Sequence, residues 1–157
     1  LNGQYAPGSA FKPAVAASAL AAGIITPQST VNCGGRYTYY AGYQPRCLQL
    51  GHRGAVSMVT ALRHSCNIYF YDVGRLLGVD TFSATAQQLG LGAPCGTELP
   101  ETTGRLTWST DENYQAGLAL MAAIGQGNTS VSPLQLAAYA GALARDGQRP
   151  ALHFAQS

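Results

Sequence analysis

A turn that leads directly into an apolar, alanine-rich run is the feature that most constrains this chain. Pro7 and Gly8 favour a turn before Ser9. In the run 14–22 that follows, Ser18 is the only polar residue, so the run predicts a buried helix. Ser9 would then lie at the helix start, where backbone N–H groups lack intrahelical acceptors and the helix dipole favours negative charge.

Lys12 follows Ser9 at a spacing that places both side chains on one helix face, about 5–6 Å apart at their Cβ atoms. A serine hydroxyl becomes an effective nucleophile when a neighbouring base takes its proton. A lysine amine serves as that base when burial lowers its pKa. Lys12 is the only lysine among the 157 residues, and the other basic residues are arginines. Ser9 and Lys12 are therefore a candidate nucleophile and base, and Pro13 predicts an irregular first turn around them.

The composition indicates a domain with a sizeable core and no nucleic-acid partner. Apolar residues make up 46% of the chain and charged residues 10%, and the net charge of +2 comes without a basic run. This pattern disfavours binding to nucleic acid or to an anionic membrane. The longest apolar segment, 13–25, is too short to span a bilayer. Because the chain begins with leucine, we expect it to be a piece of a longer protein.

The cysteines leave two alternatives open. Cys33 and Cys47 flank a loop rich in glycine and tyrosine, and a disulfide between them is expected if the domain is secreted. The other alternative is a metal site with these two cysteines and His52 as three of its ligands. His64 or Cys66 would supply the fourth, although the Cys-x-x-Cys pairs of common zinc sites are missing.

Hydrophobic periodicity and turn residues predict a mostly helical chain. The expected helices cover 14–22, a segment from residue 55 onwards, 68–77, 81–89 with Asp80 as its cap, 113–124 and 133–145. An irregular β-ribbon is expected between Cys33 and Cys47, a turn at 51–54, and a long loop at 93–112. The clearest helix start combines Ser132 as the cap, Pro133 at the first position and Gln135 at the third.

Two further short segments are candidates for a site. Ser65, Cys66 and Asn67 form a polar triplet between two helical segments, which predicts either a loop whose side chains face a cleft or a simple kink. Gly125 and Gly127 flank Gln126, and paired glycines allow the backbone to approach another segment closely.

Together, Ser9-x-x-Lys12 and Ser65-x-Asn67 are far more specific than either alone. With the flanking segments 5–13, 65–71, 125–127 and 132–135, the chain resembles the transpeptidase domain of penicillin-binding proteins. The similarity is greatest to the high-molecular-weight class B enzymes, and it extends over residues 1–157. It implies an α+β fold, of which these residues would form mostly the helical part.

The resemblance also implies a role for each site residue. Ser9 would be the nucleophile that forms the acyl-enzyme, and Lys12 its base. Ser65 would relay a proton to the leaving amine, and Asn67 would bind the substrate amide. The Ser9 N–H would supply half of an oxyanion hole.

Two further residues are expected near the substrate. Cys66 is expected to line the cleft as a small residue, and Gln126 to border the substrate groove. The resemblance implies neither a cofactor nor a metal in the catalytic site.

One departure from the family pattern concerns the third motif, Lys-Thr-Gly, which lies on a strand and gives the second oxyanion donor. Because Lys12 is the only lysine, this motif is absent from these residues. We therefore expect a partial domain, lacking most sheet strands, that acylates slowly or not at all in isolation.

The resemblance implies a peptidoglycan D,D-transpeptidase that acts on D-Ala-D-Ala stem peptides and is inhibited by β-lactams. Its expected location is the extracytoplasmic face of the membrane, with an anchor and contacts to cell-wall synthesis proteins outside this chain. The alternatives are a serine β-lactamase, for which Glu101 is the candidate residue to activate water, and a non-catalytic β-lactam sensor.

Overall fold

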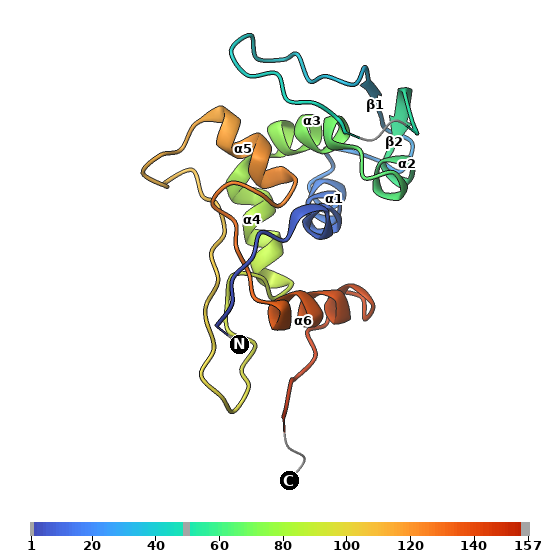
Figure 1. The fold of residues 1–157 in the computed structure, drawn as a ribbon. Coiled ribbons are helices and arrows are strands. Elements are labelled where there is room, and N and C mark those ends of the chain that lie inside the picture. Colours follow the sequence, from blue (N-terminus) through green and yellow to red (C-terminus); the bar gives the residue numbers. More distant parts are fainter. Residues whose placement is uncertain (1, 49–50, 155–157) are drawn as a thin grey trace.

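The computed structural model describes residues 2–48 and 51–154 and has mixed helical and strand structure (Figure 1). Its elements are the 3-10 helix η1 (Gly8–Phe11), α1 (Lys12–Ala21), β1 (Thr30–Cys33), β2 (Gly54–Ser57), α2 (Met58–Arg63), α3 (Asn67–Leu77), α4 (Val79–Gln88), α5 (Ala116–Ala123) and α6 (Pro133–Leu143). The predicted α+β class, with helices predominating, is confirmed. In the described ranges, no helix is both long and apolar enough to cross a membrane.

Helix α1 forms the centre of the structure and packs against both α3 and α4. Its small side chains allow this, since Ala14, Val15 and Ala19 are fully buried. The predicted irregular first turn is confirmed, because η1 precedes the α-helix and Pro13 thereby falls in the first turn of α1, where proline is tolerated. Phe11 anchors this junction, with its ring edge-on to Phe82 at 6.1 Å between centroids.

Helix α3 packs against α1, α5 and β1 (Figure 1). Tyr69, Phe70 and Tyr71 are buried. Gly74 permits the close approach of α5, since a Cβ atom there would lie 2.4 Å from the Ala123 Cβ. Substitution at Gly74 would therefore push the two helices apart.

The helix expected from residue 55 is wrong in its first part. Residues 54–57 form β2, which pairs antiparallel with β1 in the register Thr30↔Ser57 and Cys33↔Gly54. Ser57 then caps α2 by accepting a hydrogen bond from the Thr60 N–H. The three-residue spacing of Val56, Val59 and Leu62 is misleading because only Val56 is buried.

Between β1 and β2 the chain makes a long excursion, of which the structure describes residues 34–48 and 51–53 (Figure 1). It contains isolated bridges between Arg36 and Arg46 and between Tyr40 and Tyr43, which confirms the irregular β-ribbon. Part of the turn expected at 51–54 is instead the first residue of β2.

The remaining boundaries follow the sequence with small shifts. Asp80 does not cap α4; Gly78 holds that position, and the Asp80 carboxylate accepts hydrogen bonds from Ser109. Helix α5 begins at Ala116, three residues later than expected. The capping box of α6 is present as predicted, and the helix ends at Leu143.

Candidate active site

Ser9 lies in η1, at the point where two loops of the chain meet. The Gly8 N–H donates a hydrogen bond of 2.8 Å to the Gly125 carbonyl. A Cβ atom on Gly125 would lie 2.2 Å from the Gly8 carbonyl oxygen, and Gly125 has φ +71°. The close backbone approach that the paired glycines predicted is therefore confirmed, and it fixes the turn that carries Ser9.

Lys12 lies one helical turn beyond Ser9, and its amine contacts Ser9, Ser65 and Asn67. Its Nζ is 3.2 Å from Ser9 Oγ and 2.8 Å from Ser65 Oγ. It also donates to the Ser65 carbonyl at 2.8 Å and to Asn67 Oδ1 at 2.7 Å. The two hydroxyls are themselves 2.6 Å apart. One amine thus connects both serine hydroxyls and the asparagine amide.

Burial makes this amine a base. Lys12 is 1% exposed, and desolvation by burial lowers its pKa from 10.5 to about 8, while nearby cysteines act in the opposite direction. The Phe70 ring centroid lies 5.6 Å from Nζ and closes the apolar side of the site. About a tenth of the amine is then neutral at pH 7, and about half at pH 8.

The corner that carries Ser65 and Asn67 has a strained backbone and is fixed by a hydrogen bond to the preceding helix. Ser65 has φ +52°, a conformation that non-glycine residues rarely adopt. The Cys66 N–H donates a hydrogen bond of 2.8 Å to the Ala61 carbonyl, and Asn67 begins α3. The strained turn aims both polar side chains at Lys12.

A hollow of about 140 Å³ opens above this corner. It is lined by Ser9, Leu48, Ser65, Asn67, Ile124 and Gln126. Gln126 is exposed at its edge, where the sequence places it. The contributions of Leu48 and Ile124 were missed, because nothing in a loop leucine or a helix-end isoleucine distinguishes them from core residues.

Comparison with known proteins agrees with this geometry. The sequence matches the family described as "Penicillin binding protein transpeptidase domain" over residues 1–157. The chain belongs to this family.

Among curated relatives, "Peptidoglycan D,D-transpeptidase MrdA" of Salmonella typhimurium is 31% identical over 97% of this chain and 26% of its own length. "Peptidoglycan D,D-transpeptidase PbpA" of Mycolicibacterium smegmatis is 33% identical over 91% of this chain and 29% of its own length. The chain thus spans about a quarter of the length of the curated relatives it matches.

Solved structures of class B penicillin-binding proteins share the fold. Pseudomonas aeruginosa PBP2 in complex with WCK 5153 superposes with a TM-score of 0.91 and is 33% identical, covering 100% of this chain and 38% of that one. Helicobacter pylori PBP2 in complex with MreC gives a TM-score of 0.88 at 30% identity, covering 97% of this chain and 29% of that one.

In this transpeptidase domain, the expectation that Cys66 lines the cleft is corrected. Cys66 is 0% exposed, and its thiol lies with Cys33, Cys47 and His52, whose donor atoms are all within 4.8 Å of one another. The corner turns Ser65 and Asn67 towards the cleft and the residue between them towards the core. The structure has Cys33 and Cys47 as thiols, without a disulfide between them, and the four residues have the ligand types of a zinc site.

Glu101 is engaged by its own loop. Its carboxylate accepts hydrogen bonds from the Cys95 and Thr97 N–H groups at 2.8 and 2.7 Å and from the Thr97 hydroxyl at 2.7 Å. Burial acts to raise its pKa, but these hydrogen bonds lower it to about 2. Such a carboxylate is a weak base, and Glu101 is not among the residues that line the 140 Å³ hollow.

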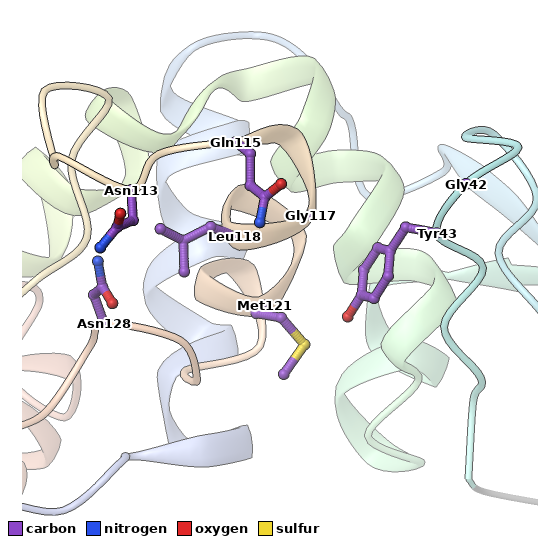
Figure 2. Close-up of a pocket in the computed structure, with 8 residues that line it drawn as sticks. All are labelled: Gly42, Tyr43, Asn113, Gln115, Gly117, Leu118, Met121 and Asn128. Atoms are coloured by element: carbon purple, nitrogen blue, oxygen red, sulfur yellow. The ribbon is translucent and has the colours of Figure 1, made fainter.

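A second hollow, of about 480 Å³, lies between α5 and the excursion (Figure 2). Its lining combines amide and apolar side chains, namely Gly42, Tyr43, Asn113, Gln115, Gly117, Leu118, Met121 and Asn128. It has more room than the hollow at Ser9 but no nucleophile–base pair. Gln126 lines the hollow at Ser9 and Asn128 lines this one, so the loop that follows α5 borders both.

Proposed function

We propose that the protein is a peptidoglycan D,D-transpeptidase that cross-links stem peptides through an acyl-enzyme on Ser9. The observation that carries this proposal is the buried Lys12 amine, which is shared by the Ser9 and Ser65 hydroxyls. A base of lowered pKa between two hydroxyls can take a proton from one and return it through the other.

Acylation follows from these contacts. The neutral Lys12 amine takes the Ser9 proton while Ser9 Oγ attacks the carbonyl of the penultimate D-alanine. Ser65, within hydrogen-bond distance of both groups, passes a proton to the departing D-alanine amine. The amine of a neighbouring stem peptide then attacks the ester, and Ser9 recovers its proton by the reverse route.

Substrate binding uses the two sides of the hollow. Asn67 directs Oδ1 to Lys12, which orients its Nδ2 donors for a substrate carbonyl. Gln126 borders the opposite side. The Ser9 N–H, in the first turn of η1, supplies one oxyanion donor, and the second belongs to the Lys-Thr-Gly strand, which is absent from these residues.

The wider setting is also a proposal. The substrate is a D-Ala-D-Ala stem peptide, β-lactams acylate the same serine, and the enzyme acts at the extracytoplasmic face of the membrane through an anchor outside this chain. Contacts with other cell-wall synthesis proteins lie outside it as well. The 157-residue chain alone acylates slowly or not at all.

Two alternatives differ in how the acyl-enzyme behaves. A serine β-lactamase requires a base that activates water, and the engagement of Glu101 by Cys95 and Thr97 disfavours that role. A sensor would keep its acyl group and would never transfer a stem peptide.

The test uses the full-length protein with nitrocefin and with a stem-peptide substrate plus a D-amino acid acceptor. A stoichiometric burst with nitrocefin, followed by slow turnover, and Ser9-dependent exchange of the terminal D-alanine support the transpeptidase. Sustained nitrocefin hydrolysis would support a β-lactamase, and a burst without exchange would support a sensor.

A further inference from the structure

The larger hollow, of about 480 Å³, takes no part in the proposed acylation, although it adjoins the hollow at Ser9. Leu118 and Met121 line the larger hollow, and Ile124 lines the one at Ser9. These three residues follow one another at three-residue spacing, so they lie on one face of α5, with successive residues about 4.5 Å apart along the helix axis. The two hollows therefore follow one another along that face.

Two separate segments form the walls of the larger hollow (Figure 2). The excursion contributes Tyr43, whose ring packs against the first turn of α5, since a Cβ atom on Gly117 would lie 3.4 Å from Tyr43 Cδ1. Asn113 and Asn128 lie on the opposite side. The Asn128 side chain is fixed, because its Nδ2 donates a hydrogen bond of 3.0 Å to Asp111 Oδ2. Residues in defined positions thus bound the hollow on both sides.

The lining of the larger hollow is polar but uncharged. Asn113, Gln115 and Asn128 present carboxamide groups, which both donate and accept hydrogen bonds. None of the lining residues in the described ranges carries a charge. A ligand carboxylate or ammonium would lose water here without gaining an opposite charge, whereas peptide amide groups match the carboxamides. The hollow therefore fits a neutral segment that contains amide groups.

The proposed reaction requires two substrates, and the hollow at Ser9 has room for the reacting end of only one. Its volume of about 140 Å³ is below the range of about 300–1,000 Å³ that is typical of small-molecule sites, whereas the larger hollow lies within that range. A donor peptide that has acylated Ser9 occupies the smaller hollow. The amine of the second peptide must then approach from a neighbouring space.

We propose that the larger hollow binds the acceptor peptide of the transfer reaction. The uncharged amide groups of the acceptor pair with Asn113, Gln115 and Asn128, and its apolar part packs against Tyr43. The loop that follows α5 then directs the acceptor amine to the ester on Ser9. This inference rests on the proposed function, because an acceptor has a role only in a transfer reaction.

The transfer step balances without a further reactant. The acceptor nitrogen attacks the ester carbonyl carbon and forms an amide bond, and the bond between that carbon and Ser9 Oγ breaks. The amine gives up one proton to Lys12, and this proton passes to the departing Ser9 oxygen, which lies 3.2 Å from Nζ in the free enzyme. Attack by water in place of the amine gives hydrolysis. Occupancy of the larger hollow therefore decides between transfer and hydrolysis.

The first experiment compares two acceptors that differ only in charge. Acetyl-Ala-Lys-Ala with a carboxamide end and the same tripeptide with a carboxylate end are added to the full-length protein with a donor stem peptide. The ratio of transfer product to hydrolysis product is followed by mass spectrometry. We expect the carboxamide to reach half-maximal transfer at a concentration on the order of tenfold lower, because the carboxylate finds no opposite charge. Equal concentrations for the two acceptors would overturn the proposal.

The second experiment changes the lining of the larger hollow. Asn113→Ala should lower the ratio of transfer to hydrolysis by about 3–10-fold, the effect of one lost hydrogen bond. Gly42→Trp should lower it further by narrowing the hollow, and an added Cβ at Gly42 meets nothing within 4 Å. Gln88→Ala, an exposed carboxamide on α4 outside both hollows, is the matched control and should leave the ratio unchanged. Slower acylation by the donor with an unchanged ratio in Asn113→Ala would assign the hollow to the donor and overturn the proposal.

A third measurement separates this inference from the proposed function. A wild-type protein that transfers the acyl group to no amine would refute the proposed function. Binding is then read from a diazirine-labelled form of the tripeptide carboxamide, crosslinked by light to the full-length Ser9→Ala variant. We expect labelling in the peptides that contain residues 42–43 and 113–121, weakened by Gly42→Trp. Labelling elsewhere, or none, would overturn the assignment of the larger hollow.

Discussion

The lysine site and the cysteine cluster lie back to back, on opposite sides of the corner 65–67, yet they satisfy their buried polar groups differently. Lys12 is surrounded by oxygen acceptors that the chain itself supplies, at 2.7–3.2 Å. The cluster brings together thiols, which are weak hydrogen-bond donors and acceptors, and the buried Nδ1 of His52, for which no hydrogen-bond partner was found among the described residues. The first site is satisfied from within the chain, whereas the second gathers weakly hydrogen-bonding groups in the protein interior.

The corner 65–67 borders both the cleft at Ser9 and the protein core. Alternating side chains at 65, 66 and 67 point to the cleft, the core and the cleft. Ser65 and Asn67 contact the Lys12 amine, and Cys66 between them is buried in the core. Substitutions of the residues that contact the Lys12 amine should therefore change the acylation rate more than the unfolding free energy. Substitutions in the backbone contacts that position the site should change both.

The largest effect is expected for Lys12→Met, which removes the base while keeping the volume of the side chain. Acylation of the full-length protein by a fluorescent penicillin should fall by about 10³–10⁴-fold. The unfolding free energy should stay the same or rise, because methionine removes the cost of burying the amine, the same cost that lowers the Lys12 pKa. Stopped-flow acylation and urea denaturation check the two parts, and a large loss of stability with little loss of rate would contradict them.

Gly125→Ala should disrupt the Gly8–Gly125 backbone contact that positions Ser9. The added Cβ would meet the Gly8 carbonyl oxygen at 2.2 Å, at φ +71°, so we expect a loss of about 2–4 kcal/mol in unfolding free energy, with slower acylation. Gly147→Ala is the matched control, since Gly147 has φ +86° with nothing within 4 Å of an added Cβ. It should cost only about 1 kcal/mol and leave acylation unchanged. Equal effects of the two variants in thermal denaturation would refute the role of the Gly8–Gly125 contact.

The pH dependence should distinguish the lysine base from the rest of the site. Below the Lys12 pKa of about 8, the acylation rate should fall about tenfold per pH unit as the amine becomes protonated, and above it the rate should level off. Between about pH 8 and 10.5 the unfolded chain binds more protons than the folded protein, because the Lys12 pKa is lower in the folded protein. Burial of Lys12 therefore lowers the unfolding free energy on the order of 3 kcal/mol below pH 8. This loss is recovered as the pH rises to 10.5. Denaturation across this range, with Lys12→Met as the control that removes the dependence, measures the effect.

The smallest effect is expected for Glu101→Gln. Loss of the charged acceptor for Cys95 and Thr97 should lower the unfolding free energy by about 1–2 kcal/mol. The rate at which a penicilloyl group leaves Ser9 should not change, because the Glu101 carboxylate accepts hydrogen bonds from Cys95 and Thr97 in its own loop. Slower deacylation, followed by intact mass over time, would instead favour the β-lactamase alternative.

The sequence predicts the site better than the surroundings of the site. Ser9 and Lys12 lie one turn apart, and the Ser65–Asn67 triplet is contiguous, so local spacing alone brings out each motif. The sequence does not predict strand β2, because Val56 in this strand is spaced three residues from Val59 in the helix that follows, as in a continuous helix. The choice between His64 and Cys66 as a fourth cluster member depends on the positive φ of Ser65, which turns Cys66 inward and which no residue pattern predicts.

The most direct measurement is peptide mapping of the full-length protein after reaction with benzylpenicillin. We predict one penicilloyl adduct per molecule, located on Ser9, and no adduct in the Ser9→Ala variant. An adduct on any other residue, or none on a folded wild-type protein at pH 8, would contradict the assignment of Ser9 as the nucleophile activated by Lys12.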